Sequence, residues 1–305
     1  MGVAKMMDEI TCILPGGYVD DAGGLHRHVV LAPLRGKEEE FLAGKPADAA
    51  LVTAILSRCV RRIGAISPVS EEVARHLLVA DRQYLLLKLR AVTFGDQVQA
   101  TIVCPWPDCG AKIDFDFLIT DIPVEESAEK GPTYRMELSP QAALTVAPGE
   151  VYREMTFRLP NGGDQEVIAP IVSENESRAL TMLLRRCMQS IGPLQEPGDA
   201  LIDSLSPLAR TEIESRMEAV APKVELTMGG NCLECGREFD QPFAFQTFFF
   251  NELRIRRDLL YREVHYLAYH YHWSEREIME MPREKRRKYI EVLAEEIERV
   301  TYAVR

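Results

Sequence analysis

Long apolar runs are missing from this sequence of 305 residues. No stretch reaches the roughly 18 to 20 apolar residues that a membrane-spanning helix needs. The opening residues, MGVAKMMDEITCILPGG, also lack the apolar core of a secretion signal. We therefore expect a cytoplasmic protein that has no membrane partner.

The motifs of common catalytic sites are absent as well. The sequence contains no glycine-rich phosphate loop, no nucleophile elbow and no HExxH motif. Three histidines near the C-terminus could bind a metal ion of their own, and an enzyme that uses this ion is one hypothesis for the function. They are His265, His270 and His272. His270 and His272 do not share a helical face, and we expect all three to pack at a helix C-terminus. The sequence therefore predicts no enzyme activity and no small-molecule substrate.

Basic residues are also fewer than a nucleic-acid-binding surface requires. The chain has 36 lysines and arginines against 47 aspartates and glutamates, so its net charge is −11. Because phosphate groups are bound by basic surfaces, this balance argues against nucleic acid as the main partner.

What the sequence does contain is a repeated segment. VTAILSRCVRRIG around Cys59 resembles LTMLLRRCMQSIG around Cys187, and 187 − 59 gives an offset of 128. The same offset separates Cys104 from Cys232. Self-similarity at a fixed spacing predicts a duplicated structural unit. Cys59 and Cys187 themselves are expected to be small buried side chains.

Two cysteine pairs carry the strongest chemical signal. They are CPWPDCG, with Cys104 and Cys109, and CLECG, with Cys232 and Cys235. Each pair lies between two strand-like runs and is followed by a glycine, as in a zinc knuckle. Two knuckles that face each other would give a tetrahedral four-sulfur site with no open position, so we predict a structural Zn²⁺. Four reduced cysteines without metal, or a redox pair, remain alternatives.

The order of the remaining patterns predicts an α+β fold. Its duplicated helix–β-hairpin units are joined by the zinc-ribbon-like site, and a C-terminal helical extension follows. We expect a strand pair over residues 9–31, turning at Leu14–Gly17 and at 20–24, and added strands over 134–158. Predicted helices in the first unit cover 47–63, run from Ser67-Pro68 to Leu78, and begin at Asp81 as N-cap. In the second unit, helices begin near Ser173 or Asn175 and at Ser206.

These elements suggest four regions along the chain. The first repeat with its N-terminal hairpin and first knuckle covers 1–120, and a linker with added strands covers 121–158. The second repeat with the second knuckle covers 159–243, and a C-terminal helical region covers 244–305.

The C-terminal region is rich in aromatic residues. It is predicted to contain one long helix from about 246 to 273, a capping box at Ser274 with Glu277, and a last helix after Met281-Pro282. Its aromatic side chains could form a partner surface, but folding back as core is favoured. These are Phe248, Phe249, Phe250, Tyr266 and Trp273.

Several segments together resemble a known family. LPGGYVDDAGGLHRHVVLAPLRGKEEEFLA, LSRCVRRIG, VADRQYLLLKLRAVTFGD, FRLPNGGDQE and HYHWSEREIMEMPREKRRKYIEVL are similar to the baseplate hub assembly chaperones of T-even-type contractile-tailed phages and related extracellular contractile injection systems. The four paired cysteines match the ribbon-like pattern of that family, although the first pair is more widely spaced.

The resemblance implies a non-enzymatic role in baseplate assembly. The partners would be baseplate or tail hub proteins of a contractile injection particle, and the family motif supplies no catalytic residue. A nucleic-acid-binding or regulatory zinc ribbon is the alternative function.

Overall fold

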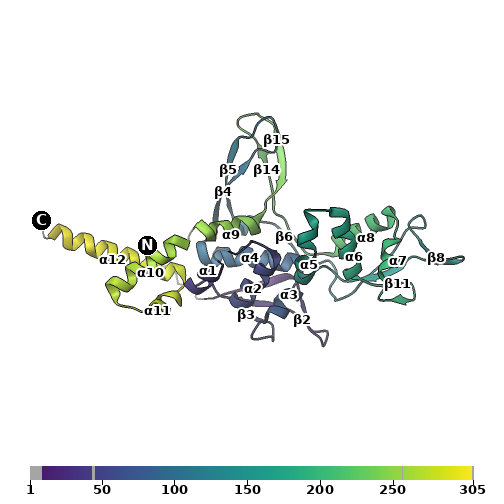
Figure 1. Ribbon diagram of the computed structural model, residues 1–305, viewed down its shortest axis with the longest axis horizontal. Coiled ribbons are helices and arrows are strands. Elements are labelled where there is room, and N and C mark those ends of the chain that lie inside the picture. The colour runs from purple at the N-terminus through teal and green to yellow at the C-terminus, as the bar shows by residue number, and fades with distance from the viewer. Residues whose placement is uncertain (1–8, 43–44, 256, 304–305) are drawn as a thin grey trace.

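The computed structural model describes residues 9–42, 45–255 and 257–303 and shows an elongated molecule (Figure 1). The C-terminal helix lies at one end of the long axis and a β-hairpin at the other, and a pair of hairpins projects sideways between them. Helices and strands are mixed along the chain, which confirms the predicted α+β class. None of the helices in the described ranges is both long enough and apolar enough to cross a bilayer.

The first half of the chain packs helices on a three-stranded antiparallel sheet. Its strands follow the order β1–β2–β3, and buried leucines, isoleucines and valines from the sheet and helices form one core. The elements are β1 (Ile10–Val19), β2 (Leu25–Leu31), α1 (Gly36–Leu42), α2 (Ala49–Cys59), β3 (Val60–Ile63), α3 (Glu71–His76) and α4 (Val79–Phe94).

The predicted turn at Leu14–Gly17 is wrong. Strand β1 continues through these residues, its register with β2 shifts between Ile13 and Tyr18, and the chain reverses only at 20–24. The carboxylate of Asp81 accepts the backbone N–H groups of Gly16 and Gly17, both at 2.8 Å. Asp81 is therefore not the N-cap of α4, which is Leu78. Burial raises the pKa of Asp81 to about 6, and the two N–H donors act in the opposite direction.

The second half contains a four-stranded antiparallel sheet with the order β12–β11–β10–β7 and a separate buried core. Its elements are β7 (Tyr134–Glu137), β8 (Leu144–Ala147), β9 (Glu150–Tyr152), β10 (Glu154–Phe157), α5 (Gly162–Val172), α6 (Glu176–Cys187), β11 (Met188–Ile191), β12 (Leu194–Gln195), α7 (Asp199–Asp203) and α8 (Pro207–Val220). The strands expected within 134–158 are confirmed, as are the N-caps Asn175 and Ser206.

Three helices that the sequence did not predict are α1, α5 and the short α7. The Pro160-Asn161-Gly162-Gly163 segment, whose residue types are typical of a turn, leads directly into α5, where Asn161 and Asp164 form a capping box. The helix predicted over 47–63 ends earlier, at Cys59, and the helix that begins after Asn175 ends at Cys187. Each is followed by a strand. Both cysteines are buried as expected.

Each half has an equivalent hydrogen bond to the carbonyl of its buried cysteine. Ala32 N–H donates to the carbonyl of Cys59 and Arg158 N–H to that of Cys187, each at 2.9 Å. The strand pairs β2–β3 and β10–β11 are both antiparallel, and each has a register irregularity at its end, before Leu31 and before Phe157. Both halves therefore contain the order strand, helix, helix and strand, and in each half the last strand pairs antiparallel with the first.

The halves meet where α2 and α4 lie against α5. Arg82, which is 1% exposed, donates to the hydroxyl of Thr53 at 2.9 Å and to the carbonyls of Ala49 and Ala74. Gly162 lies directly over this guanidinium, so that a Cβ there would be 2.1 Å from Nη1 of Arg82. Arg75 bonds Glu166 of α5 at 2.9 Å beside this contact.

Gly162→Ala is expected to destabilise the protein by about 1–3 kcal/mol, because the new methyl group must displace a guanidinium held by three hydrogen bonds. The free energy of unfolding in urea measures this. Gly131→Ala is the matched control, since its Cβ would meet nothing closer than 3.8 Å. Equal unfolding midpoints for the two variants would contradict the packing argument.

In the described residues of the C-terminal region, the helices are α9 (Phe245–Ile255), α10 (Arg257–Tyr271), α11 (Glu275–Met279) and α12 (Arg283–Ala303). The single long helix predicted for 246–273 is described as α9 and α10, with Arg256 between them outside the described residues. The capping box of Ser274 and Glu277 is confirmed. Phe249 and Phe250 are buried in the first core, and Trp273 stacks on Tyr271 with centroids 4.6 Å apart.

Candidate metal centre

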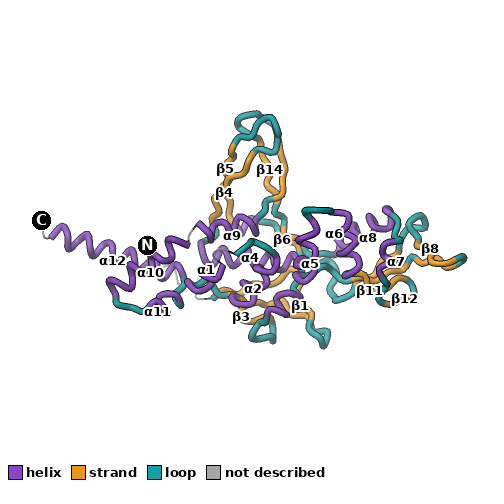
Figure 2. The backbone as a smooth tube through the Cα atoms, viewed as in Figure 1, coloured by secondary structure: helices purple, strands orange, loops and turns teal. Residues whose placement is uncertain are grey.

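The projecting part of the molecule is built from two antiparallel hairpins (Figure 2). One is β4 (Gln97–Val103) with β5 (Lys112–Leu118), and the other is β14 (Thr227–Asn231) with β15 (Glu238–Pro242). A short 3₁₀ helix, η1 (Ile119–Asp121), and the strand pair of β6 (Val124–Glu125) with β13 (Lys223–Val224) lie at their base. The hairpins pack through one apolar face each, with the rings of Phe115 and Phe239 6.0 Å apart.

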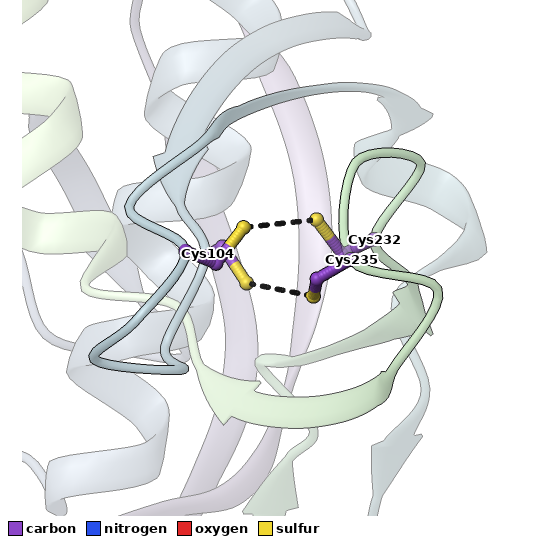
Figure 3. Close-up of side chains that lie close together, drawn as sticks. Cys104, Cys232 and Cys235 are labelled. Atoms are coloured by element: carbon purple, nitrogen blue, oxygen red, sulfur yellow. Dashed lines mark hydrogen bonds between the residues drawn. The ribbon is translucent and has the colours of Figure 1, made fainter.

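The loops of the two hairpins bring the four paired cysteines together (Figure 3). The sulfurs of Cys104 and Cys235 are 3.9 Å apart, and those of Cys109 and Cys232 are 3.7 Å apart. All four ligand atoms lie within 4.8 Å of one another, and all four cysteines are free of disulfides. Four thiols in this arrangement could hold one metal ion.

Each loop has the backbone geometry that suits thiolate ligands. Gly110 and Gly236, which follow the second cysteine of each pair, have φ values of 63° and 68°. This left-handed conformation favours glycine. It lets the chain turn so that the N–H groups of Ala111 and Arg237 point at the sulfurs of Cys109 and Cys235. The wider first loop closes by an additional bond from Cys109 N–H to the carbonyl of Trp106.

The thiols do not share one electrostatic environment. Burial raises the pKa of Cys104 to about 12. The backbone N–H of Arg237, together with its guanidinium, lowers the pKa of Cys235 to about 6. Four ionised sulfurs within this small volume would repel one another, so a cation among them is needed to keep all four ionised.

Side chains outside the cysteines join the two loops. The guanidinium of Arg237 contacts the carboxylate of Asp108 at 2.6 Å and lies 4.8 Å from the ring centroid of Trp106. Trp106 in turn donates its indole N–H to the carbonyl of Glu238 at 3.2 Å. The sequence reasoning did not single out these residues, and the only available signal was their place inside or next to the cysteine loops.

A series of aromatic rings connects the hairpins to the body. Phe117 lies 5.8 Å from Phe243, and Phe243 contacts Phe248 of α9 at 5.3 Å. Phe245 and Phe249 stack at 6.2 Å and continue into the first core. The hairpins are therefore joined to the body through α9, whose Phe245, Phe249 and Phe250 are buried in the first core.

The three C-terminal histidines do not form such a cluster. His265 stacks on Tyr269 at 6.3 Å, and His270 meets the edge of Tyr266 at 4.8 Å. His272 follows α10 with a φ of 58°. Within the described ranges, the four cysteines are the one group of metal-ligating side chains that lies close enough to bind an ion.

The outer faces of the hairpins are acidic. Asp114, Asp116, Glu238 and Asp240 are all exposed on β5 and β15. A surface of this charge repels nucleic acid phosphates, and this does not favour the nucleic-acid-binding alternative.

A family model described as T4 bacteriophage base plate protein matches residues 27–250. The match covers both halves, the cysteine hairpins and the start of α9. The chain belongs to the T4 bacteriophage base plate protein family. Membership supports a structural or assembly role in a phage baseplate, with other baseplate or tail proteins as partners.

A second model, a family of unknown function (DUF6760), matches residues 253–304, which include α10, α11 and α12. The boundary between the two matches falls within α9. Comparison with curated proteins and with solved structures gives no match.

Proposed function

We propose that this protein is a non-enzymatic assembly chaperone or structural component of the baseplate hub in a phage-tail-like contractile injection system. The observation that carries the proposal is the base plate family match across residues 27–250. The proposal adds the hub, the chaperone role and the injection particle to what that match supports.

The architecture suits a protein that holds others in place. Three separate parts extend from the central body, namely the cysteine hairpins, the β8–β9 end and the C-terminal helices (Figure 1). Each presents a different surface, so one chain can contact several neighbours at once. Among the described residues, the side chains close enough together to hold a metal ion are the four cysteines. Their sulfurs would fill all four positions of a tetrahedral ion and leave none for a substrate.

The test uses a tagged chain in cells that produce the particle, together with a strain from which the gene is deleted. We expect the tagged chain to retain baseplate or hub proteins, and the deletion strain to lack complete particles in electron micrographs. Presence of the chain in purified particles at fixed stoichiometry would assign it as a component, and its absence would assign it as a chaperone. Normal particles from the deletion strain, without any retained baseplate protein, would refute both.

We further propose that the four cysteines bind structural Zn²⁺. With Zn–S bonds of about 2.3 Å, a tetrahedral site places its sulfurs about 3.8 Å apart. The separations of 3.9 and 3.7 Å fit this value. The ion would connect two hairpins that are far apart in the chain. Iron also accepts four sulfurs, so metal analysis has to distinguish the two.

We also propose that the halves descend from one duplicated unit. The support comes from the matching element order and from the paired hydrogen bonds to the carbonyls of Cys59 and Cys187. Helices α4 and α8 begin at Val79 and Pro207, and 207 − 79 gives the same offset of 128 as the cysteines.

A further inference from the structure

The four cysteines of the site differ in their access to solvent. Cys104 and Cys232 are 4% and 1% exposed, whereas Cys109 and Cys235 lie partly at the surface. The groups around a metal site control solvent access to it, and a competing ligand needs such access to remove the ion. The residues that contact the partly exposed sulfurs therefore influence how long the site keeps its ion.

The site also carries excess negative charge. Four thiolates around a divalent ion leave a net charge of about −2. Each loop adds to this charge, because the ionisable residue between its two cysteines is an acid, Asp108 in the first loop and Glu234 in the second. The basic residues that follow the loops are Lys112 and Arg237. Compensation of the excess charge therefore depends on where these two cations lie.

Arg237 contacts its own cysteine loop through both backbone and side chain. Its N–H and its guanidinium both hydrogen bond the sulfur of Cys235. Its carbonyl accepts the N–H of Cys232 at 3.0 Å. A hydrogen bond from a cation to a thiolate is charge-assisted. The guanidinium is thus placed to offset part of the negative charge that remains on Cys235 when a metal ion is bound.

The opposite loop holds the guanidinium in this position. One nitrogen of Arg237 lies 2.6 Å from each carboxylate oxygen of Asp108, and the ring centroid of Trp106 is 4.8 Å from the guanidinium. The side chains of Arg237 and Asp108 are 39% and 70% exposed, and salt bridges as exposed as this one contribute little stability. The pair therefore serves mainly to orient the guanidinium toward the sulfur.

We infer that Arg237 is a positioning residue of the metal site, which holds the Cys235 thiolate by its guanidinium and slows loss of the ion from the partly exposed side. The inference rests on the proposed structural zinc and adds a residue that controls how firmly the ion is held. Hydrogen-bond partners of metal ligands commonly change metal affinity by about 10–100-fold.

The test follows the transfer of zinc from the full chain to an excess of a chromogenic chelator. Arg237→Gln is expected to release zinc at least about tenfold faster than wild type, because the thiolate loses its cationic donor. Lys112→Gln is the matched control, since it removes the same charge beside the other loop, and its rate should change less than about twofold. Arg237→Lys keeps the charge without the planar set of donors, so its rate should fall between those of wild type and Arg237→Gln.

Co²⁺ in place of zinc distinguishes a hydrogen bond to sulfur from a clamp between the loops. A donor to a thiolate lowers the energy of the sulfur electrons, so the sulfur-to-cobalt charge-transfer band should move to lower energy in Arg237→Gln. Asp108→Asn keeps the guanidinium and should move the band less. Equal shifts and equal release rates in these two variants would show that Arg237 acts only by joining the loops, and would overturn the inference.

Each variant is loaded to one ion per chain before the transfer, which shows that its site is folded. If Arg237→Gln cannot be loaded, Arg237→Lys decides, and its release at the wild-type rate would contradict the inference. Equal rates in Arg237→Gln and Lys112→Gln would do the same while leaving the zinc proposal intact. Wild-type protein that binds neither zinc nor cobalt would refute the zinc proposal itself, so the two failures are distinguishable.

Discussion

Cys232→Ser is expected to reduce the bound metal from about one ion per chain to almost none and to unfold the two cysteine hairpins. Cys232 is 1% exposed and its sulfur lies 3.7 Å from that of Cys109, so no other described side chain is placed to substitute for it. Structural zinc contributes about 10–16 kcal/mol to the folding of small zinc domains. The apolar cluster that joins the hairpins has only four buried members and cannot replace that contribution.

Elemental analysis of the purified protein measures the metal, and hydrogen exchange of the backbone amides in β14 and β15 measures the folding. The two larger cores are separate clusters, so their amides should remain protected. Cys12→Ala removes a buried cysteine outside the site and should keep one ion per chain. Wild-type protein without metal, or hairpin protection that survives in Cys232→Ser, would contradict a structural metal.

Arg286→Ala is expected to cost about 3–5 kcal/mol and to release the C-terminal helices from the body. Arg286 is fully buried and bonds Glu39 of α1 at 2.6 Å and Glu263 of α10 at 3.1 Å. Arg283 also contacts Glu39, at 3.0 Å. Without Arg286, the two buried carboxylates keep only Arg283 as a cationic partner, so one negative charge is left uncompensated in a medium of low polarity, which is the source of the large cost.

Limited proteolysis between residues 253 and 303, together with urea unfolding, checks this result. Arg299→Ala removes an arginine from the same helix whose pair with Glu296 is exposed, so stability should change by less than about 0.5 kcal/mol. Equal proteolysis of the two variants would show that the buried ion pairs do not attach the helices. Glu39→Gln combined with Arg286→Met should recover part of the loss, because the double variant removes one charge of each sign and leaves Arg283 with Glu263.

The boundary between the two family matches separates the residues that the buried ion pairs join. The base plate match ends at Phe250 and the second match begins at Leu253, while Glu39 lies in the first region and Glu263 with Arg286 in the second. The C-terminal helices are thus attached to the base plate region by a few buried charged side chains.

Features that depend on residues close together in sequence were predicted well. The caps at Asn175, Ser206 and Ser274 were found because a capping side chain bonds a backbone group two or three residues away. The cysteine loops were found for the same reason, since cysteine spacing and the glycine that follows define the turn. The α+β class followed from apolar periodicity.

Features that depend on distant residues were missed. Asp81 has the sequence signature of an N-cap, but its carboxylate bonds Gly16 and Gly17, 65 and 64 residues away. That contact holds the Leu14–Gly17 segment inside a strand where glycine and proline suggested a turn. Helices α1 and α5 were missed because their short sequences with glycines have weak helix propensity, and packing against α9 and α2 stabilises them.

The sequence by itself determined the two cysteine pairs, the main helix caps and the mixed class of this protein, because each is encoded by side chains that act on their immediate neighbours. Only the tertiary structure decided that the two cysteine loops face each other, that Arg286 lies buried between two carboxylates, and that the outer half of α12 remains exposed. The reason is that these arrangements depend on which surfaces meet when the chain folds, and a linear pattern does not specify the contacts between residues more than a hundred positions apart.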